Sequence, residues 1–80
     1  MRQMGTARQG IIQQVFMLAL YALHTDTQAG KELVAHLKTR KLRGSEEYYA
    51  PVLLDYSKQM KDHLHQDYQS TLDLLIQLLS

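Results

Sequence analysis

The fold of this 80-residue chain is decided by one stretch, Ile11-Ile-Gln-Gln-Val-Phe-Met-Leu-Ala-Leu-Tyr-Ala-Leu23. Its apolar residues recur at steps of three and four, which is the spacing of one face of an α-helix. They are Ile11, Ile12, Val15, Phe16, Ala19, Leu20, Ala22 and Leu23. Met17, Leu18 and Tyr21 widen that face further. We therefore expect a central helix over residues 7–24 that other helices cover on more than one side.

Capping residues divide the chain after this helix. The run Thr25-Asp-Thr27 ends one helix and starts the next, because short polar side chains accept hydrogen bonds from free backbone N–H groups. Gly44 is a natural left-handed terminator for the second helix. The acids that follow Ser45 favour a helix start. Pro51 leaves two alternatives, a short turn before a helix that begins near Ala50, or one helix with a kink.

The pattern predicts an all-α fold, a small bundle of three to four helices in a single domain over residues 1–80. The expected helices cover residues 7–24, 28–42, 46–66 and 71–80. Ser70 and Asp73 form a Ser-x-x-Asp capping signature for the last of them. Tyr49 and Tyr56 fall at core positions of the third, with their hydroxyls at the rim.

The closing run is apolar nearly all round, and a helix apolar on every face must be buried on every face. Because three short helices do not surround a fourth, we expect this helix to pack against another copy or a partner helix. Otherwise the chain is a fragment whose next segment is absent. The predicted partner interface comprises Leu72, Leu74, Leu75, Leu78 and Leu79.

Composition removes several classes of protein. Nine Lys and Arg side chains nearly balance eight Asp and Glu, so the formal net charge of +1 argues against a strongly basic nucleic-acid coat. The absence of cysteine excludes disulfide scaffolds, cysteine zinc fingers, iron–sulfur sites and thiol nucleophiles. The apolar run that starts at Val15 is shorter than the ~20 residues a membrane span needs and has a poor cleavage pattern. We expect a cytoplasmic protein with no membrane partner.

Neither catalysis nor a cofactor is expected. In the cluster Asp62, His63, His65 and Asp67, His63 and Asp67 share a helix face, but His63 and His65 point to nearly opposite sides of a helix, so no metal site is predicted. The four serines lack a nucleophile-elbow motif, and no glycine-rich phosphate loop follows a strand.

One basic run is a candidate for nucleic-acid contact. It holds four cations within six residues, Lys38, Arg40, Lys41 and Arg43, which can neutralise phosphates. The alternative is a solvated helix end that its own dipole stabilises. Tyr48, Tyr49 and Tyr56 are placed to stack on bases near such a patch.

Parts of the chain resemble the N-terminal half of NusB, the bacterial transcription antitermination family. The run that begins at Ala7 and Arg8 is similar to the first NusB helix, most closely at Leu20-Tyr-Ala-Leu23. The segment Glu47-Tyr-Tyr-Ala-Pro-Val-Leu-Leu-Asp-Tyr56 is similar to the third NusB helix. Gln13 and Gln14 replace the Arg-Glu pair of the family.

The resemblance implies a non-enzymatic RNA-binding module that acts with a NusE-type ribosomal protein on single-stranded boxA RNA. It implies RNA contacts at Arg8 and, more weakly, at Arg2. Two hypotheses therefore stay open. One is this antitermination module, and the other is a self-associating helical interaction or regulatory protein, phage- or plasmid-encoded or immunity-protein-like, which binds no nucleic acid.

Overall fold

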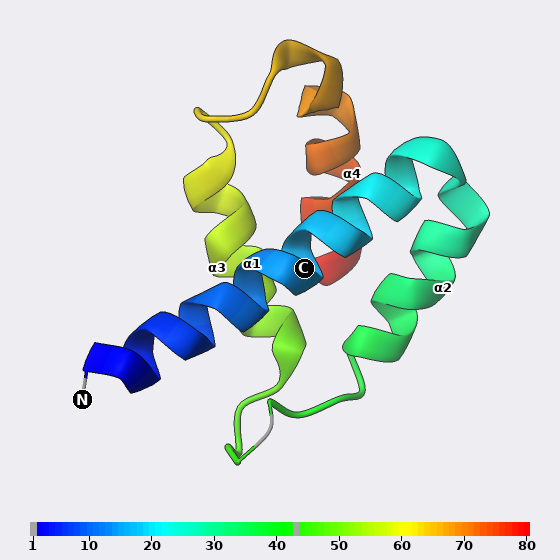
Figure 1. Ribbon diagram of the computed structural model, residues 1–80. Coiled ribbons are helices and arrows are strands. Elements are labelled where there is room, and N and C mark those ends of the chain that lie inside the picture. The colour runs from blue at the N-terminus through cyan, green and yellow to red at the C-terminus, as the bar shows by residue number, and fades with distance from the viewer. Residues whose placement is uncertain (1, 43) are drawn as a thin grey trace.

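A computed structural model describes residues 2–42 and 44–80, with side-chain burial and contacts from residue 10 onward. These residues form four α-helices, α1 (Arg2–Thr25), α2 (Thr27–Leu37), α3 (Tyr49–Met60) and α4 (Gln69–Leu79), and a short 3₁₀ helix, η1 (Gln66–Tyr68). Over the same residues the one β interaction is an isolated antiparallel bridge between Lys41 and Tyr48. The expected all-α bundle is confirmed (Figure 1).

The helices are arranged around α1. In Figure 1, α1 crosses the front of the molecule, α3 and α2 lie on either side of it, and α4 lies behind. Each of the four α-helices packs against the other three, and α1 and α2 share the most extensive contact. The four helices therefore form one bundle.

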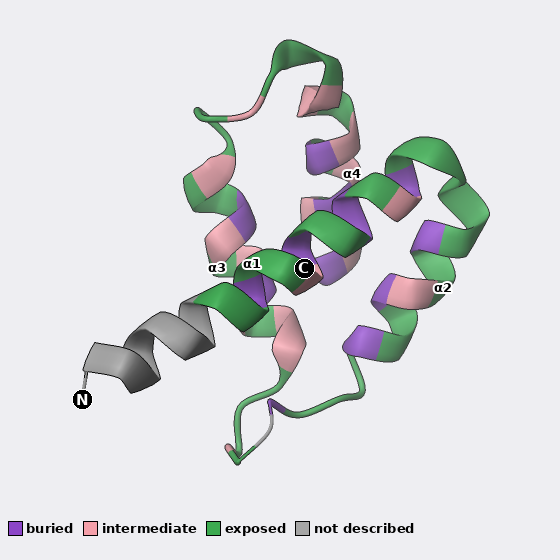
Figure 2. Cartoon of the chain, in the orientation of Figure 1, coloured by how far each residue is buried: buried purple, intermediate pink, exposed green. Residues whose placement is uncertain are grey.

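The core forms where the inner stripe of α1 meets the other helices. Phe16 is fully buried, and its ring packs edge-on against Tyr56 of α3, with ring centroids 5.0 Å apart and planes at 72°. The remaining buried residues of α1 follow the helical spacing. The buried apolar core comprises Ile12, Phe16, Ala19, Leu20, Leu23, Val34, Leu37, Leu42, Leu53, Leu72, Leu75 and Leu79. Figure 2 shows these buried bands turned toward the middle of the bundle.

A single residue, Asp26, connects α1 to α2. Its side chain accepts a hydrogen bond from the backbone N–H of Ala29 at 3.3 Å, as expected for a helix cap. The two helices then approach closely at Gly30. An ideal Cβ atom on Gly30 would lie only 2.6 Å from the backbone N and Cα of Leu23. The crossing of α1 and α2 therefore depends on the missing side chain of Gly30.

The expected second helix, residues 28–42, ends five residues early at Leu37. The Thr39 hydroxyl donates to the carbonyl of His36 at 2.8 Å and closes the last turn. The chain then forms a loop in which Leu42 N–H donates to the Glu47 carbonyl at 2.7 Å, and Tyr49 N–H donates to the Arg40 carbonyl at 2.9 Å. Burial of Leu42 and these two bonds stabilise the loop better than another helical turn would.

The turn of this loop contains Gly44, whose φ of +73° is left-handed as expected. Its expected role as the terminator of the second helix is wrong, because α2 already ends at Leu37 with Lys38 as its cap. The third helix begins at Tyr49, so Pro51 lies in its first turn, where its missing N–H leaves no helical bond unmade. The first alternative for Pro51, a turn followed by a helix, is therefore correct.

The expected third helix, 46–66, and the expected cap at Ser70 are both wrong in detail. Helix α3 ends at Met60, and α4 begins at Gln69, which places Ser70 inside the helix. The Gln69 side chain donates to the carbonyls of Lys61 at 2.7 Å and Leu64 at 3.0 Å. These bonds hold the connecting segment in place, because its carbonyls accept from Gln69 instead of from the backbone N–H groups of a longer α3. Asp73 forms an ion pair with Lys61 at 2.6 Å instead of capping a helix.

We predict that Gly30→Ala destabilises the protein by about 2–3 kcal/mol, because the added methyl group overlaps the backbone of Leu23. The matched control is Gly10→Ala in α1, where a Cβ atom meets nothing within 4 Å. This change should stabilise the helix by about 0.5–1 kcal/mol. Urea unfolding followed by circular dichroism measures both. Equal stability of Gly30→Ala and the unmodified chain would contradict the close approach.

Candidate functional site

The side of α1 that faces away from the bundle is apolar and exposed. Its large side chains retain much of their accessible surface: 47% for Ile11, 48% for Met17, 60% for Leu18 and 63% for Tyr21. The expectation that α1 is covered on more than one side is therefore wrong. Figure 2 shows exposed bands along α1 on the side turned toward the viewer. We call this surface the outer face of α1, comprising Gly10, Ile11, Gln13, Gln14, Met17, Leu18 and Tyr21.

Geometry explains why the outer face stays open. Successive residues of an α-helix are 100° apart, so the inner stripe from Ile12 to Leu23 already occupies the side that faces the other helices. Residues 11, 18 and 21 point to the opposite side and stay exposed, and Tyr21 alone of these three lines a small cavity with Leu64 and Tyr68. A helical-wheel projection of the sequence separates two apolar sides of this helix. A domain of four short helices covers one of them, so the other is the candidate for an exposed surface.

The outer face has a shallow groove along its length. It is lined by Gly10, Gln13, Gln14, Met17, Leu18 and Tyr21, none of which is charged. Gly10 contributes no side chain to this groove, and a Cβ atom there would lie in open space. A smaller cavity of about 120 Å³ adjoins the groove, lined by Met17, Leu20, Tyr21, Leu64 and Tyr68. The outer face thus has a large ring at Tyr21 and no side chain at Gly10.

The leucines predicted as a partner interface on the closing helix lie elsewhere. Leu72, Leu75 and Leu79 are between 0% and 5% exposed and belong to the intramolecular core, so the prediction is wrong for these three residues. The reason is that α4 packs against α1, α2 and α3 together, so one side of it is buried within the chain itself. Leu74 and Leu78 are half-buried and pack at the edge of the same core.

The cations predicted to contact RNA are only partly brought together. Lys38 caps the C-terminus of α2, and Arg40 and Lys41 lie in the following loop, all three exposed. Arg43 lies outside the described residues, and the side chains of Arg2 and Arg8 lie outside the described part of α1. The described cations therefore form one short strip at the end of α2.

Neighbouring groups contact the cations of this strip, and one of them, Glu46, offsets part of its positive charge. Lys41 Nζ lies 2.9 Å from Glu46 Oε1, and it also lies 5.7 Å from the ring centroid of Tyr48. The Arg40 guanidinium lies 3.4 Å from Nε2 of His36. Tyr48 is 43% exposed and extends the strip with an aromatic surface, whereas Tyr49 and Tyr56 pack against the core as expected.

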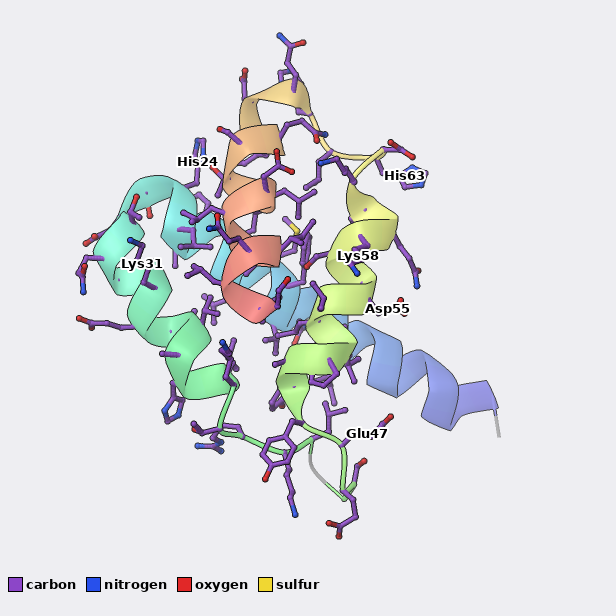
Figure 3. The ribbon with its side chains drawn as sticks, turned by 180° about the vertical axis from the view of Figure 1, so that it is seen from behind. His24, Lys31, Glu47, Asp55, Lys58 and His63 are labelled. Atoms are coloured by element: carbon purple, nitrogen blue, oxygen red, sulfur yellow. The ribbon has the colours of Figure 1, made fainter. Side chains whose placement is uncertain are left out.

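Ionisable side chains do not converge on a common point. Figure 3 shows His24, Lys31, Glu47 and His63 at separate places around the molecule, on α1, on α2 and in two different loops. Among the described residues, no group of three or more His, Asp or Glu side chains is placed to hold a metal ion. Over the same part of the chain, no helix has the length and hydropathy to cross a membrane.

Comparisons with protein-family models, curated proteins and solved structures find no match for this chain. The resemblance to NusB therefore stays a prediction that rests on the residues quoted for it. The choice between the two hypotheses depends on the surfaces of the molecule, which are the outer face of α1 and the basic strip.

We predict that Leu75→Ala destabilises the protein by about 2–4 kcal/mol, because the substitution leaves a cavity in the core. The matched control is Leu18→Ala on the outer face, which should change the stability of the monomer by less than about 0.5 kcal/mol. Thermal or urea unfolding at low protein concentration compares the two. Equal effects at both positions would mean that α4 is not part of the core.

Proposed function

We propose that this protein is a non-enzymatic, self-associating helical interaction module, and that the outer face of α1 is its association surface. The observation that carries the proposal is the row of four large apolar side chains, each 47–63% exposed, on one side of one helix. Contiguous apolar surface of this kind is often an interaction site in small proteins.

The size of the surface sets the strength of the association. The four exposed side chains amount to roughly 400–500 Å² of surface, within the about 300–600 Å² of the largest patch on a typical monomer. Two such faces together bury about 800–1,000 Å², which is at the lower limit for specific interfaces. We therefore expect a weak, reversible dimer with a Kd on the order of 1–100 μM.

The chemistry of the surface favours a second copy of the chain as its occupant. The residues that line the groove carry no charge, so two identical faces meet without like-charge repulsion. Gln13 and Gln14 each offer both a donor and an acceptor, so each can bond to a polar group of the second copy or to water at the rim of the interface. An association surface on α1 replaces the one that the sequence had suggested on α4.

We predict that Leu18→Glu abolishes self-association and leaves the fold intact. Burial of a carboxylate in an apolar interface is costly, whereas Leu18 is 60% exposed in the monomer and tolerates a polar group there. Sedimentation velocity over roughly 5–500 μM protein, a range set by the expected affinity, measures the association. The unmodified chain should change from monomer to dimer, and Leu18→Glu should stay monomeric.

The charge-matched control is Ala35→Glu, at an exposed position of α2 outside the outer face. This variant should associate like the unmodified chain. Circular dichroism of all three proteins should show the same helical content. A chain that remains monomeric at the highest concentration, or a Leu18→Glu variant that still dimerises, would refute the proposal.

A second candidate function is contact with single-stranded RNA through the basic strip. One observation favours it: Lys41 Nζ lies 5.7 Å from the exposed ring of Tyr48, and Lys38 and Arg40 are exposed in the same short segment. Cations beside an aromatic ring suit phosphates and stacked bases. The ion pair of Lys41 with Glu46 limits the number of cations free to neutralise phosphates. The resemblance to NusB implies a separate RNA contact at Arg8, in the N-terminal segment.

For this second candidate, we predict that Lys38→Gln and Arg40→Gln each lower the salt dependence of RNA binding by about one counterion. Arg8→Ala should do the same if the resemblance to NusB is correct. Lys31→Gln, near the start of α2, is the control and should have no effect. Fluorescence anisotropy with a short boxA-like RNA, with and without a NusE-type protein, measures binding. No binding at low salt would exclude this function.

A further inference from the structure

The outer face of α1 has a polarity along its length that determines how two copies fit together. Resting on the proposed self-association through α1, we propose that the two α1 helices pack antiparallel, with Tyr21 of each copy seated over Gly10 of the other. The partner is thus a second copy of this chain in a defined register.

The two ends of the outer face have opposite shapes. Gly10 has no side chain of its own, and a Cβ atom there would meet none of the described atoms within 4 Å. Tyr21 lies three turns further along and, at 63% exposed, is the most exposed of the large apolar side chains. With a rise of 1.5 Å per residue, the two positions are about 16–17 Å apart along the helix.

Only one relative orientation matches these shapes. In a parallel pair, Gly10 would face Gly10 and leave a void, while the two Tyr21 rings would compete for the same space. An antiparallel pair places each ring over a glycine, where the helices come close and the aromatic surface is covered. The helix dipoles also align favourably when the helices run in opposite directions.

The residues between the two ends fit the same register. The midpoint between Gln14 and Met17 along α1 coincides with the midpoint between Gly10 and Tyr21. An antiparallel pair that places Tyr21 over Gly10 therefore also places Gln14 opposite Met17. The flexible Met17 side chain can adapt to the methylene groups of Gln14. The cavity beside Met17 and Tyr21 leaves these two side chains room to move. The Gln14 amide reaches the rim, where water completes its hydrogen bonds.

Cross-linking tests the orientation directly, because the chain has no cysteine of its own. The variants are Gly10→Cys and Tyr21→Cys, one of which is labelled with a heavy isotope. Each variant alone, and an equimolar mixture of the two, is treated with a short thiol-to-thiol cross-linker. We expect the mixed product between Gly10→Cys and Tyr21→Cys to dominate by at least about tenfold over either self-product. Mass spectrometry identifies each product by its isotope content.

A second variant tests the space over Gly10 without chemical modification. Gly10→Leu should weaken dimerisation of the chain at least tenfold in sedimentation velocity, because the added side chain occupies the seat of Tyr21. Because Gly10 is an exposed position of α1, Gly10→Leu should preserve the helical content, which circular dichroism checks. Ala35→Leu, at an exposed position of α2, is the control for an added leucine and should leave dimerisation unchanged.

The outcomes separate this inference from the proposed function. Self-products of Gly10→Cys and of Tyr21→Cys would show a parallel pair and overturn the inference. A dimer that Leu18→Glu abolishes, but in which Gly10→Leu has no effect and no mixed product forms, would leave the proposed function intact and refute the register. A chain that never dimerises would refute both.

Discussion

Every other α-helix of this protein packs against α1, so the bundle depends on the inner stripe that α1 presents to them. Phe16 lies at the centre of that stripe and contacts Tyr56 of α3, while Leu23 lies directly against Gly30 of α2. The stripe occupies only one side of α1, because three short helices reach no further around it. Both the core and the exposed surface of the molecule follow from this constraint.

The exposed side of α1 would be a liability if it had no partner. Its apolar residues raise the tendency to associate without adding to the stability of the monomer. The large side chains of α4 are already part of the core, and Leu18 and Tyr21 stay 60% and 63% exposed although Leu64 and Tyr68 adjoin Tyr21. Association between copies relieves this exposure, and the uncharged groove makes it compatible with an identical partner.

Much of the fold could be predicted from the sequence because local signals and helical spacing agree. Asp26 caps α2, Gly44 adopts a left-handed turn, and Pro51 lies in the first turn of α3, each as its chemistry indicates. The sequence failed where tertiary contacts decide. The end of α2 depends on a backbone pairing with residues 47–49, and the cover of α4 depends on contacts with three distant helices.

The candidate site was harder to predict for the same reason. A residue such as Leu18 fits the apolar pattern of a core helix as well as Phe16 does, and only the packing of the other helices distinguishes the two. The basic run was visible in the sequence, but the ion pair between Lys41 and Glu46 depends on a loop that periodicity does not predict. Whether a residue is exposed depends on which other segments pack over it, and the sequence of one segment alone does not show this.

The one-residue connection at Asp26 also bears on how the chain folds. Helices α1 and α2 are adjacent in sequence, and their contact at Leu23 and Gly30 closes a loop of only a few residues, at little cost in chain entropy. Contacts between α1 and α4, in contrast, require closure of a loop that includes α2 and α3. Because nearby contacts form fastest, we expect the α1–α2 hairpin to assemble first and to serve as the template on which α3 and α4 condense.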